Sequence, residues 1–221
     1  MVFLNREEAG GKLSHALKNY KDDELVVIGI PRGGVVVAAQ VAKALKARLD
    51  VIIPRKIGAP HNPEVAIGAV TQDGTVIKDD TMVEILGISD DQIRDMASQV
   101  EQEISRRVST YRGGRPGVEM RNKTVIVVDD GVATGYTVKA ALQSVRRAGA
   151  RRLVLAVPVA PADTASDLNK LVDDFICLHT PEIFYAVGQF YLDFDQTTDE
   201  EVIGLLAEAG GRQEKAVEYK H

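Results

Sequence analysis

Short apolar runs alternate with longer helical patterns along most of the chain, and polar turns separate them. The apolar run at residues 25–30 predicts a buried strand, and the Val- and Ala-rich segment at residues 34–48 predicts a helix. Further apolar runs predict strands at residues 51–53, 124–128, 153–157 and 175–178. Such alternation is typical of an α/β fold, in which helices flank a mostly parallel sheet, here of five strands.

Turn and capping signals predict the remaining elements. The Asp-Gly pair within residues 65–77 predicts a β-hairpin. A capping box at residues 89–92 opens a helix whose apolar positions run at helical spacing through residues 93–108. A second capping box at residues 198–201 predicts a short terminal helix, after which we expect residues 208–221 to form a frayed polar tail.

The most informative segment is residues 125–137, where an apolar strand ends in Asp129 and Asp130 and a Gly- and Thr-containing turn leads into a helix. Glycines let the backbone approach a ligand, and a helix N-terminus presents free N–H groups, so this turn predicts a phosphate site. Adjacent carboxylates repel phosphate but accept hydrogen bonds from vicinal hydroxyls or a hydrated metal ion. The two halves together fit a ribose 5-phosphate. The alternative is that either Asp merely caps the following turn.

This segment resembles the phosphoribosyl-pyrophosphate (PRPP) motif of the type I phosphoribosyltransferases. It departs from that motif at Gly131, where the family usually has a larger apolar residue. The resemblance implies the fold of that family, a mostly parallel sheet flanked by helices with a small hood subdomain. It also implies that Asp129 and Asp130 hold the ribose hydroxyls, and Mg²⁺ through water, while residues 133–137 hold the 5′-phosphate. The implied PRPP-binding residues are Arg32, Gly33, Gly34, Arg55, Lys56, Asp129, Asp130, Gly131, Val132, Ala133, Thr134, Gly135, Tyr136 and Thr137.

Loops after two other strands support this hypothesis. Residues 31–34 resemble the pyrophosphate loop of the family, and the Arg32–Gly33 bond is our candidate for a strained or cis peptide. Arg55 and Lys56 follow the second strand, where cations would stabilise a departing pyrophosphate; the alternative is a solvated basic pair. The predicted catalytic residues are Asp129, Asp130, Lys56 and Arg32.

Residues 57–64 are rich in Gly and Pro and show no apolar period. They resemble the mobile loop that covers the active site in the family, so we expect an irregular segment, of which residues 58–64 are mobile without ligand and close over bound PRPP and Mg²⁺. Within it, we interpret His61 as a polar loop residue rather than a general base. Glu64 has two interpretations, a residue facing the substrate or the start of the next strand.

Six of the eleven aromatic residues lie within residues 175–194, where the family carries its hood, built here mainly from residues 175–207. Aromatic faces can stack on a flat base, although these rings could equally form the core of the subdomain. The candidates for acceptor binding are Phe184, Tyr185 and Tyr191. Ala133 stands where the branch acting on 6-oxopurines usually carries an Asp, so hypoxanthine and guanine are expected to be poor acceptors.

Composition and charge restrict the partners. A net charge of −5 disfavours nucleic acid, and the longest apolar run, residues 153–162, is too short to span a membrane. The N-terminus becomes charged too early for a signal peptide, which predicts a cytoplasmic protein. We expect one domain over residues 1–207, with a homodimer as a further expectation, that moves phosphoribose from PRPP to a nitrogenous acceptor and releases pyrophosphate. The alternative is a catalytically weak PRPP-binding regulator of a protein partner.

Overall fold

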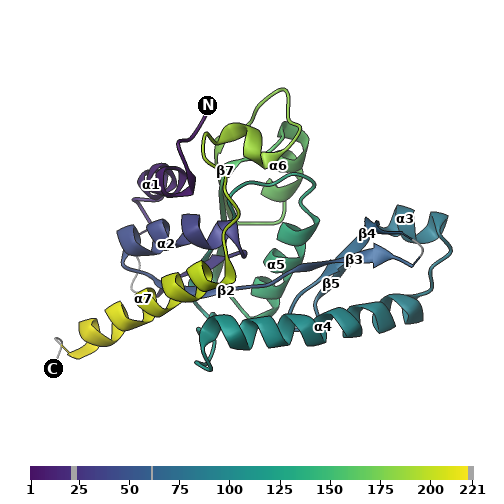
Figure 1. The fold of residues 1–221 in the computed structure, drawn as a ribbon, viewed down its shortest axis with the longest axis horizontal. Coiled ribbons are helices and arrows are strands. Elements are labelled where there is room, and N and C mark those ends of the chain that lie inside the picture. The colour runs from purple at the N-terminus through teal and green to yellow at the C-terminus, as the bar shows by residue number, and fades with distance from the viewer. Residues whose placement is uncertain (21–23, 61, 219–221) are drawn as a thin grey trace.

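The computed structural model describes residues 1–20, 24–60 and 62–218, and it confirms the predicted α/β fold (Figure 1). All five strands of its central sheet run parallel, in the order β2-β1-β6-β7-β8. These strands are β1 (Leu25–Gly29), β2 (Arg48–Val51), β6 (Thr124–Val128), β7 (Arg152–Val159) and β8 (Asp174–His179). The sheet contains every strand predicted for it, although β2 begins and ends earlier than residues 51–53.

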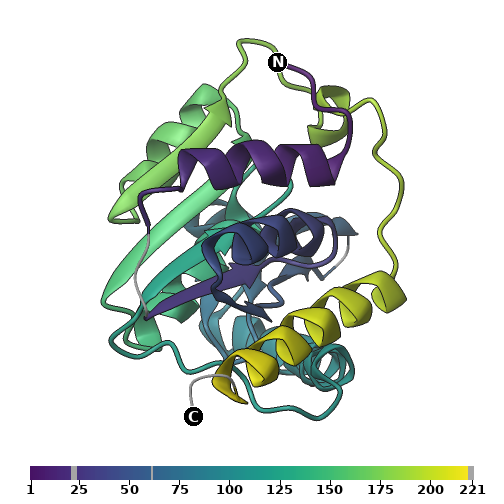
Figure 2. The same ribbon diagram turned by 90° about the vertical axis from the view of Figure 1, so that its left-hand side faces the viewer.

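Helices cover both faces of this sheet. They are α1 (Arg6–Ala16), α2 (Gly33–Leu45), α5 (Tyr136–Arg147), α6 (Ala162–Asn169) and α7 (Asp199–Glu218). Successive residues of a strand point to opposite faces, so Val27 of β1 packs with α1 and α2, whereas Val26 and Ile28 pack with α5 and α6. Figure 2 shows α1, α2 and α7 side by side over one face. This burial on both sides explains the continuous apolar runs in the sequence.

A second, antiparallel sheet projects to the right in Figure 1, with the strand order β3-β4-β5. The strands of this sheet are β3 (Arg55–Ala59), β4 (Asn62–Val70) and β5 (Val76–Lys78). The helices that follow it in the chain are α3 (Asp80–Ile85) and α4 (Asp90–Arg112). The predicted hairpin is confirmed as β4 and β5, which pair around the turn that contains Gly74. The capping box at Ser89 is also confirmed, and Ile93, Ile104 and Val108 of α4 are buried.

The prediction of an irregular segment at residues 57–64 is wrong for most of its length. β3 extends to Ala59 and β4 begins at Asn62, and the two strands pair with shifts of register on either side of Gly58. Ile57 and Ala59 are both buried, so β3 alternates as an amphipathic strand does, but too few residues repeat to reveal it in the sequence. His61 lies outside the described residues.

Three helices differ from the prediction, and one of them, the short α3, matches no predicted element. α1 was not predicted, because its polar and Gly-containing sequence has almost no apolar periodicity. The capping box of α7 is confirmed, with Thr198 N donating to Glu201 Oε2 at 2.7 Å. That helix continues to Glu218, into the segment predicted as a frayed tail. Its residues Val202 and Leu206 are buried in the core shared with α2 and α4, which holds the first half of the helix in place.

The predicted hood is smaller in the structure, because β8 joins the main sheet and α7 joins the core. Between them, residues 180–197 include a short 3₁₀ helix (Val187–Phe190) and pack against the N-terminus. Phe3 N donates to Phe190 O at 2.8 Å, and Phe3, Phe190 and Tyr191 form a small aromatic core. Across the described part of the chain, no helix combines the length and apolar character needed to cross a membrane.

Candidate active site

A pocket of about 470 Å³ opens at the carboxyl ends of β1 and β6. These strands are parallel neighbours, so the loops that follow them meet at one edge of the sheet. The pocket therefore joins segments separated by about a hundred residues in sequence. It is lined by Arg6, Ile30, Pro31, Arg32, Gly33, Pro54, Asp129, Asp130, Thr137, Phe194, Gln196 and Thr197.

The loop after β1 approaches Asp129 and Asp130 so closely that it needs its glycines. A Cβ atom on Gly34 would lie 2.8 Å from Asp129 Oδ1, and one on Gly33 would overlap the carboxylate of Asp130. Arg32 is the N-cap of α2, which has no side-chain cap, so N–H groups of its first turn face the same edge. The cis peptide is Pro31–Arg32, so the prediction of Arg32–Gly33 is wrong by one residue.

The structure brings together the predicted acid pair, Asp129 and Asp130. Asp129 Oδ1 accepts a hydrogen bond from Asp130 N at 2.8 Å. Burial raises the pKa of Asp129 well above its usual value, and the neighbouring charge of Asp130 raises it further. Burial also raises the pKa of Asp130, but a cation beside it opposes this shift. The acid pair is thus a partly buried and partly uncompensated charge, which favours hydroxyl donors or a metal ion nearby.

The cation beside Asp130 is Arg6, which the sequence analysis missed. Arg6 Nε donates to Asp130 Oδ2 at 2.7 Å, and Arg6 Nη1 donates to Asp195 O at 2.7 Å. The guanidinium carbon also lies 3.8 Å from the centroid of the Phe194 ring. Arg6 therefore links the acid pair to the hood. No local motif identifies this residue, since its partners lie more than a hundred positions away in sequence.

The turn predicted to hold phosphate lies beside the acid pair. Gly135 is the N-cap of α5 with a φ of 79°, a left-handed conformation that favours glycine, and no side chain caps the helix. The N–H groups of the first turn are therefore available to an anion, with Thr137 lining the pocket. The side chains of Thr134 and Ala133 are exposed. Tyr136 turns away, and its hydroxyl donates to Asp79 at the N-cap of α3.

Gly131, the departure from the family motif, is explained by the hood. A Cβ atom at Gly131 would lie 2.5 Å from Val187 Cγ1 and 3.0 Å from Val159 Cγ1. The absent side chain is thus replaced by Val187, which packs into the turn from the 3₁₀ helix. The next residue, Val132, is buried, and its N–H donates to Val159 O at 2.9 Å. We infer that these contacts keep the turn well packed despite the glycine.

The predicted basic pair divides between two faces of β3. Arg55 is half-buried, and its Nη1 lies 3.8 Å from Glu103 Oε1 on α4. Lys56 is exposed, because alternate residues of a strand point to opposite sides. Pro54, directly before this pair, lines the pocket, whereas Lys56 is absent from its lining. Arg55 does not line the pocket either, but its contact with Glu103 joins it to α4, whereas Lys56 is exposed.

None of the three aromatic candidates for acceptor binding lines this pocket. Tyr191 is buried, and its hydroxyl donates to Asp130 O at 2.5 Å, so it holds the backbone of the acid pair in place. Phe184 packs against Phe190 in the hood core, and Tyr185 is 86% exposed. The aromatic side chain that does line the pocket is Phe194, stacked against both Tyr191 and Arg6.

The acid pair fits a metal ion that is shared with a substrate. Among the described residues, no three His, Cys, Asp or Glu side chains are placed to hold a metal together. Asp130 is already paired with Arg6, which leaves Asp129 as the less compensated carboxylate. Mg²⁺ commonly binds one or two carboxylates and completes its shell with waters and substrate phosphates. This donor set suits such a shared site next to a phosphate-binding turn.

Comparisons with known proteins agree with this geometry. Residues 5–195 match the family model described as "Phosphoribosyl transferase domain". Two Mycobacterium tuberculosis proteins, MT0597 and Rv0571c, provisionally named phosphoribosyl transferases, are 40% identical over 208 residues, which cover 94% of this chain and 47% of each relative. The chain thus spans about half the length of these relatives. The crystal structure of TT1426 from Thermus thermophilus is similar, with 40% identity and a TM-score of 0.81, covering 94% of this chain and 99% of that one.

Proposed function

Because this chain belongs to the phosphoribosyl transferase domain family, we propose that it transfers the phosphoribosyl group of PRPP to a nitrogenous acceptor. The bond between C1 and pyrophosphate breaks, and a bond forms between C1 and a ring nitrogen of the acceptor. The observation that carries the proposal is one pocket lined by the acid pair, Arg32 and Thr137 of the uncapped α5 N-terminus. Those groups match the diol, the pyrophosphate and the 5′-phosphate of PRPP.

The acid pair positions the sugar. Asp129 and Asp130 accept hydrogen bonds from the 2′- and 3′-hydroxyls, while N–H groups at the start of α5 bind the 5′-phosphate. Both ends of the ribose are then fixed on one strand and the turn that follows it. Arg6 binds the carboxylate of Asp130 and Tyr191 binds its backbone oxygen, so the residue is held in place before the substrate arrives. Such fixed orientation lowers the entropic part of the reaction barrier.

Positive charge balances the leaving group. As the C1–oxygen bond breaks, the sugar becomes cationic and negative charge grows on pyrophosphate, so donors already in place stabilise the transition state. Arg32 lines the pocket at the first strand end and is placed for this role. Mg²⁺, held by Asp129 and Asp130 through water and by the substrate, would supply further neutralisation of the phosphates.

We assign acceptor binding to the hood side of the pocket. Phe194 presents a ring there, and Gln196 and Thr197 supply polar groups beside it. A flat heterocycle can stack on the aromatic face and hydrogen-bond with the polar side chains. This assignment replaces the three aromatic residues expected from the sequence with one that lines the pocket.

A screen of nucleobases and related heterocycles with PRPP and Mg²⁺, read by released pyrophosphate, tests the proposal. Turnover with at least one acceptor that is lost in Asp129→Asn supports it. PRPP binding without turnover on any acceptor would instead favour the regulator hypothesis. Failure to bind PRPP by calorimetry would contradict both functions.

A further inference from the structure

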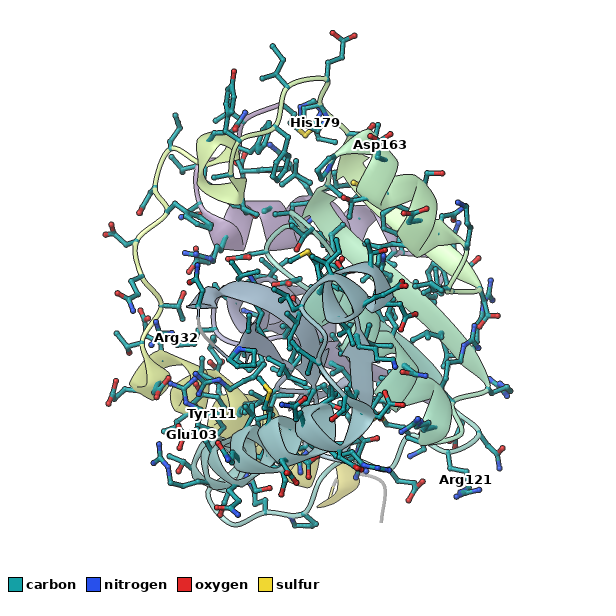
Figure 3. The ribbon with its side chains drawn as sticks, turned by 90° about the vertical axis from the view of Figure 1, so that its right-hand side faces the viewer. Arg32, Glu103, Tyr111, Arg121, Asp163 and His179 are labelled. Carbon is teal, nitrogen blue, oxygen red and sulfur yellow. The ribbon has the colours of Figure 1, made fainter. Side chains whose placement is uncertain are left out.

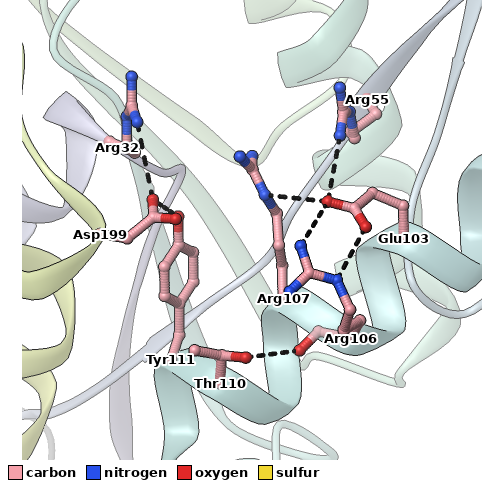
Figure 4. Close-up of polar contacts among 8 residues, drawn as sticks. All are labelled: Arg32, Arg55, Glu103, Arg106, Arg107, Thr110, Tyr111 and Asp199. Carbon is pink, nitrogen blue, oxygen red and sulfur yellow. Dashed lines mark hydrogen bonds and ion pairs between the residues drawn. The ribbon is translucent and has the colours of Figure 1, made fainter.

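A cluster of arginines adjoins the pocket on the side opposite the hood. Figure 3 places Arg32, Tyr111 and Glu103 along one side of the molecule, and Figure 4 shows the network around them. Its charges come from α2, β3, α4 and α7, which are far apart in sequence. They are Arg32, Arg55, Arg106, Arg107, Glu103 and Asp199, four cations against two anions. In a chain of net charge −5, this local excess of positive charge is unusual.

Most ion pairs of this network are long. Glu103 binds Arg106 with two hydrogen bonds of 2.9 Å, but its Oε1 lies 3.4 Å from Arg107 Nε and 3.8 Å from Arg55 Nη1. On the other side, Arg32 Nη1 lies 3.7 Å from Asp199 Oδ1. Partly exposed pairs of this length contribute little stability, so an incoming anion can replace them at small cost.

Arg107 is the least satisfied of these cations. Within the described part of the chain, its buried Nε has no hydrogen-bond partner. Figure 4 shows its guanidinium between those of Arg32 and Arg55, with all three directed to the same side. Arg106 instead lies along α4, and its side chain is 68% exposed against 32% for Arg107. These neighbouring arginines share Glu103 as a partner, but they differ in how closely they pair with it and in direction.

We propose that Arg107, with Arg32 and Arg55, binds the pyrophosphate group of PRPP and holds the released pyrophosphate. We call these three residues the arginine cluster; this inference rests on the proposed function, because it assigns a site to the same substrate. A planar guanidinium presents paired donors that match phosphate oxygens, and three of them suit a group with several negative charges. Arg32 lines the pocket, and Arg55 directly follows the lining residue Pro54, so the arginine cluster adjoins the pocket through these two positions.

The competing explanation is structural. Arg107 lies four residues after Glu103 on α4, so an ordinary helix ion pair could be its whole role. That explanation predicts no difference between Arg107 and Arg106, since both pair with Glu103. Arg106→Gln is therefore a matched control: it removes the same charge, one position away, from the better-paired neighbour.

The test measures binding of inorganic pyrophosphate, with and without Mg²⁺, by calorimetry on the full chain. We expect Arg107→Gln to weaken binding roughly tenfold or more and Arg106→Gln to change it less than about threefold, because a charged hydrogen bond is lost in the first case. Equal affinities in the two variants, or no binding to the unmodified protein, would overturn the inference. Arg107→Lys keeps the charge and should bind pyrophosphate with intermediate affinity. Its affinity can be compared with that of Arg106→Gln even if Arg107→Gln does not fold.

This design separates the inference from the proposed function, because pyrophosphate binding requires no turnover. Binding that depends on Arg107 without transfer to any acceptor would support the arginine cluster and contradict the transferase proposal. Transfer that proceeds with unchanged PRPP affinity in Arg107→Gln would support the transferase and overturn the role of Arg107.

Discussion

Consecutive carboxylates, Asp129 and Asp130, form one side of the pocket, close to the backbone of a neighbouring loop and held by short hydrogen bonds. The other side is the arginine cluster, in which Arg32 lines the pocket and Arg55 and Arg107 lie behind it; these three are held by ion pairs of 3.4–3.8 Å. The first side is rigid and negative, and the second is loosely paired and positive. The difference matches their proposed ligands, since the sugar must be fixed in place while pyrophosphate must be bound and then released.

The largest effect should come from the rigid side. Asp129→Asn and Asp130→Asn are each expected to weaken PRPP binding roughly tenfold or more, since hydrogen bonds to a charged group contribute ~1.5–3 kcal/mol. Asp193→Asn is the control, because Asp193 is an exposed carboxylate of the hood that does not line this pocket. Calorimetry that finds one PRPP affinity for all three variants would remove the acid pair from the site.

The second prediction tests the positive side through two adjacent residues. Arg55→Gln should weaken pyrophosphate binding several-fold, and Lys56→Gln should have a smaller effect, because Arg55 belongs to the arginine cluster and Lys56 is an exposed residue outside it. Each exposed charge contact contributes about 1 kcal/mol or less, which sets the scale of this expectation. Titration of both variants at the same ionic strength is the measurement. A larger loss in Lys56→Gln would restore the role first predicted for that residue.

The two sides also differ in how far the sequence predicts them. Asp129 and Asp130 end one apolar strand and precede one turn, so their chemistry and position lie within thirteen residues. No short sequence pattern identifies the arginine cluster or Arg6, because tertiary packing of α1, α4 and β3 brings these residues to the pocket. Hydrophobic periodicity and capping boxes predicted the parallel sheet and most helices. They failed at β3, a short strand containing Gly, and at α1, whose apolar positions are too few.

The acid pair should also reduce the stability of the unliganded protein. The folded-state pKa of Asp129 is raised, so stability is lost as pH rises from the unfolded pKa through the folded one, and the full penalty applies above the folded pKa. Asp129→Asn removes this penalty and should melt at a higher temperature at pH 8 than the unmodified protein. A gain of about 1 kcal/mol corresponds to about 2–4 °C for a domain of this size.

Two comparisons check that reading of Asp129. The difference in melting temperature should shrink as pH falls below the usual pKa of an Asp carboxyl, about 3.9, because the carboxyl is then mostly protonated in both states. Asp130→Asn should stabilise less, or destabilise, because it leaves Arg6 without its carboxylate partner. A lower melting temperature for Asp129→Asn at pH 8 would mean that its hydrogen bond with Asp130 N outweighs the buried charge.

The smallest effect on pyrophosphate binding is expected at Tyr111, which binds Asp199, the ion-pair partner of Arg32. Tyr111 OH donates to Asp199 Oδ1 at 2.6 Å. The pKa of Tyr111 is raised to about 12, mainly by burial and to a smaller extent by the Asp199 carboxylate. The hydroxyl therefore stabilises the fold fully below pH 10 and loses its contribution between pH 10 and about 12. Tyr111→Phe should lower the free energy of unfolding by about 1 kcal/mol at pH 8, the usual worth of one hydrogen bond. Urea unfolding at increasing alkaline pH should also show a smaller loss of stability for this variant than for the unmodified protein.

Because Asp199 still faces Arg32 in Tyr111→Phe, pyrophosphate affinity should change less than in Arg107→Gln. A loss of affinity as large as that of Arg107→Gln would show that Asp199 and Tyr111 fix the arginines rigidly, and the contrast between the two sides of the pocket would no longer hold.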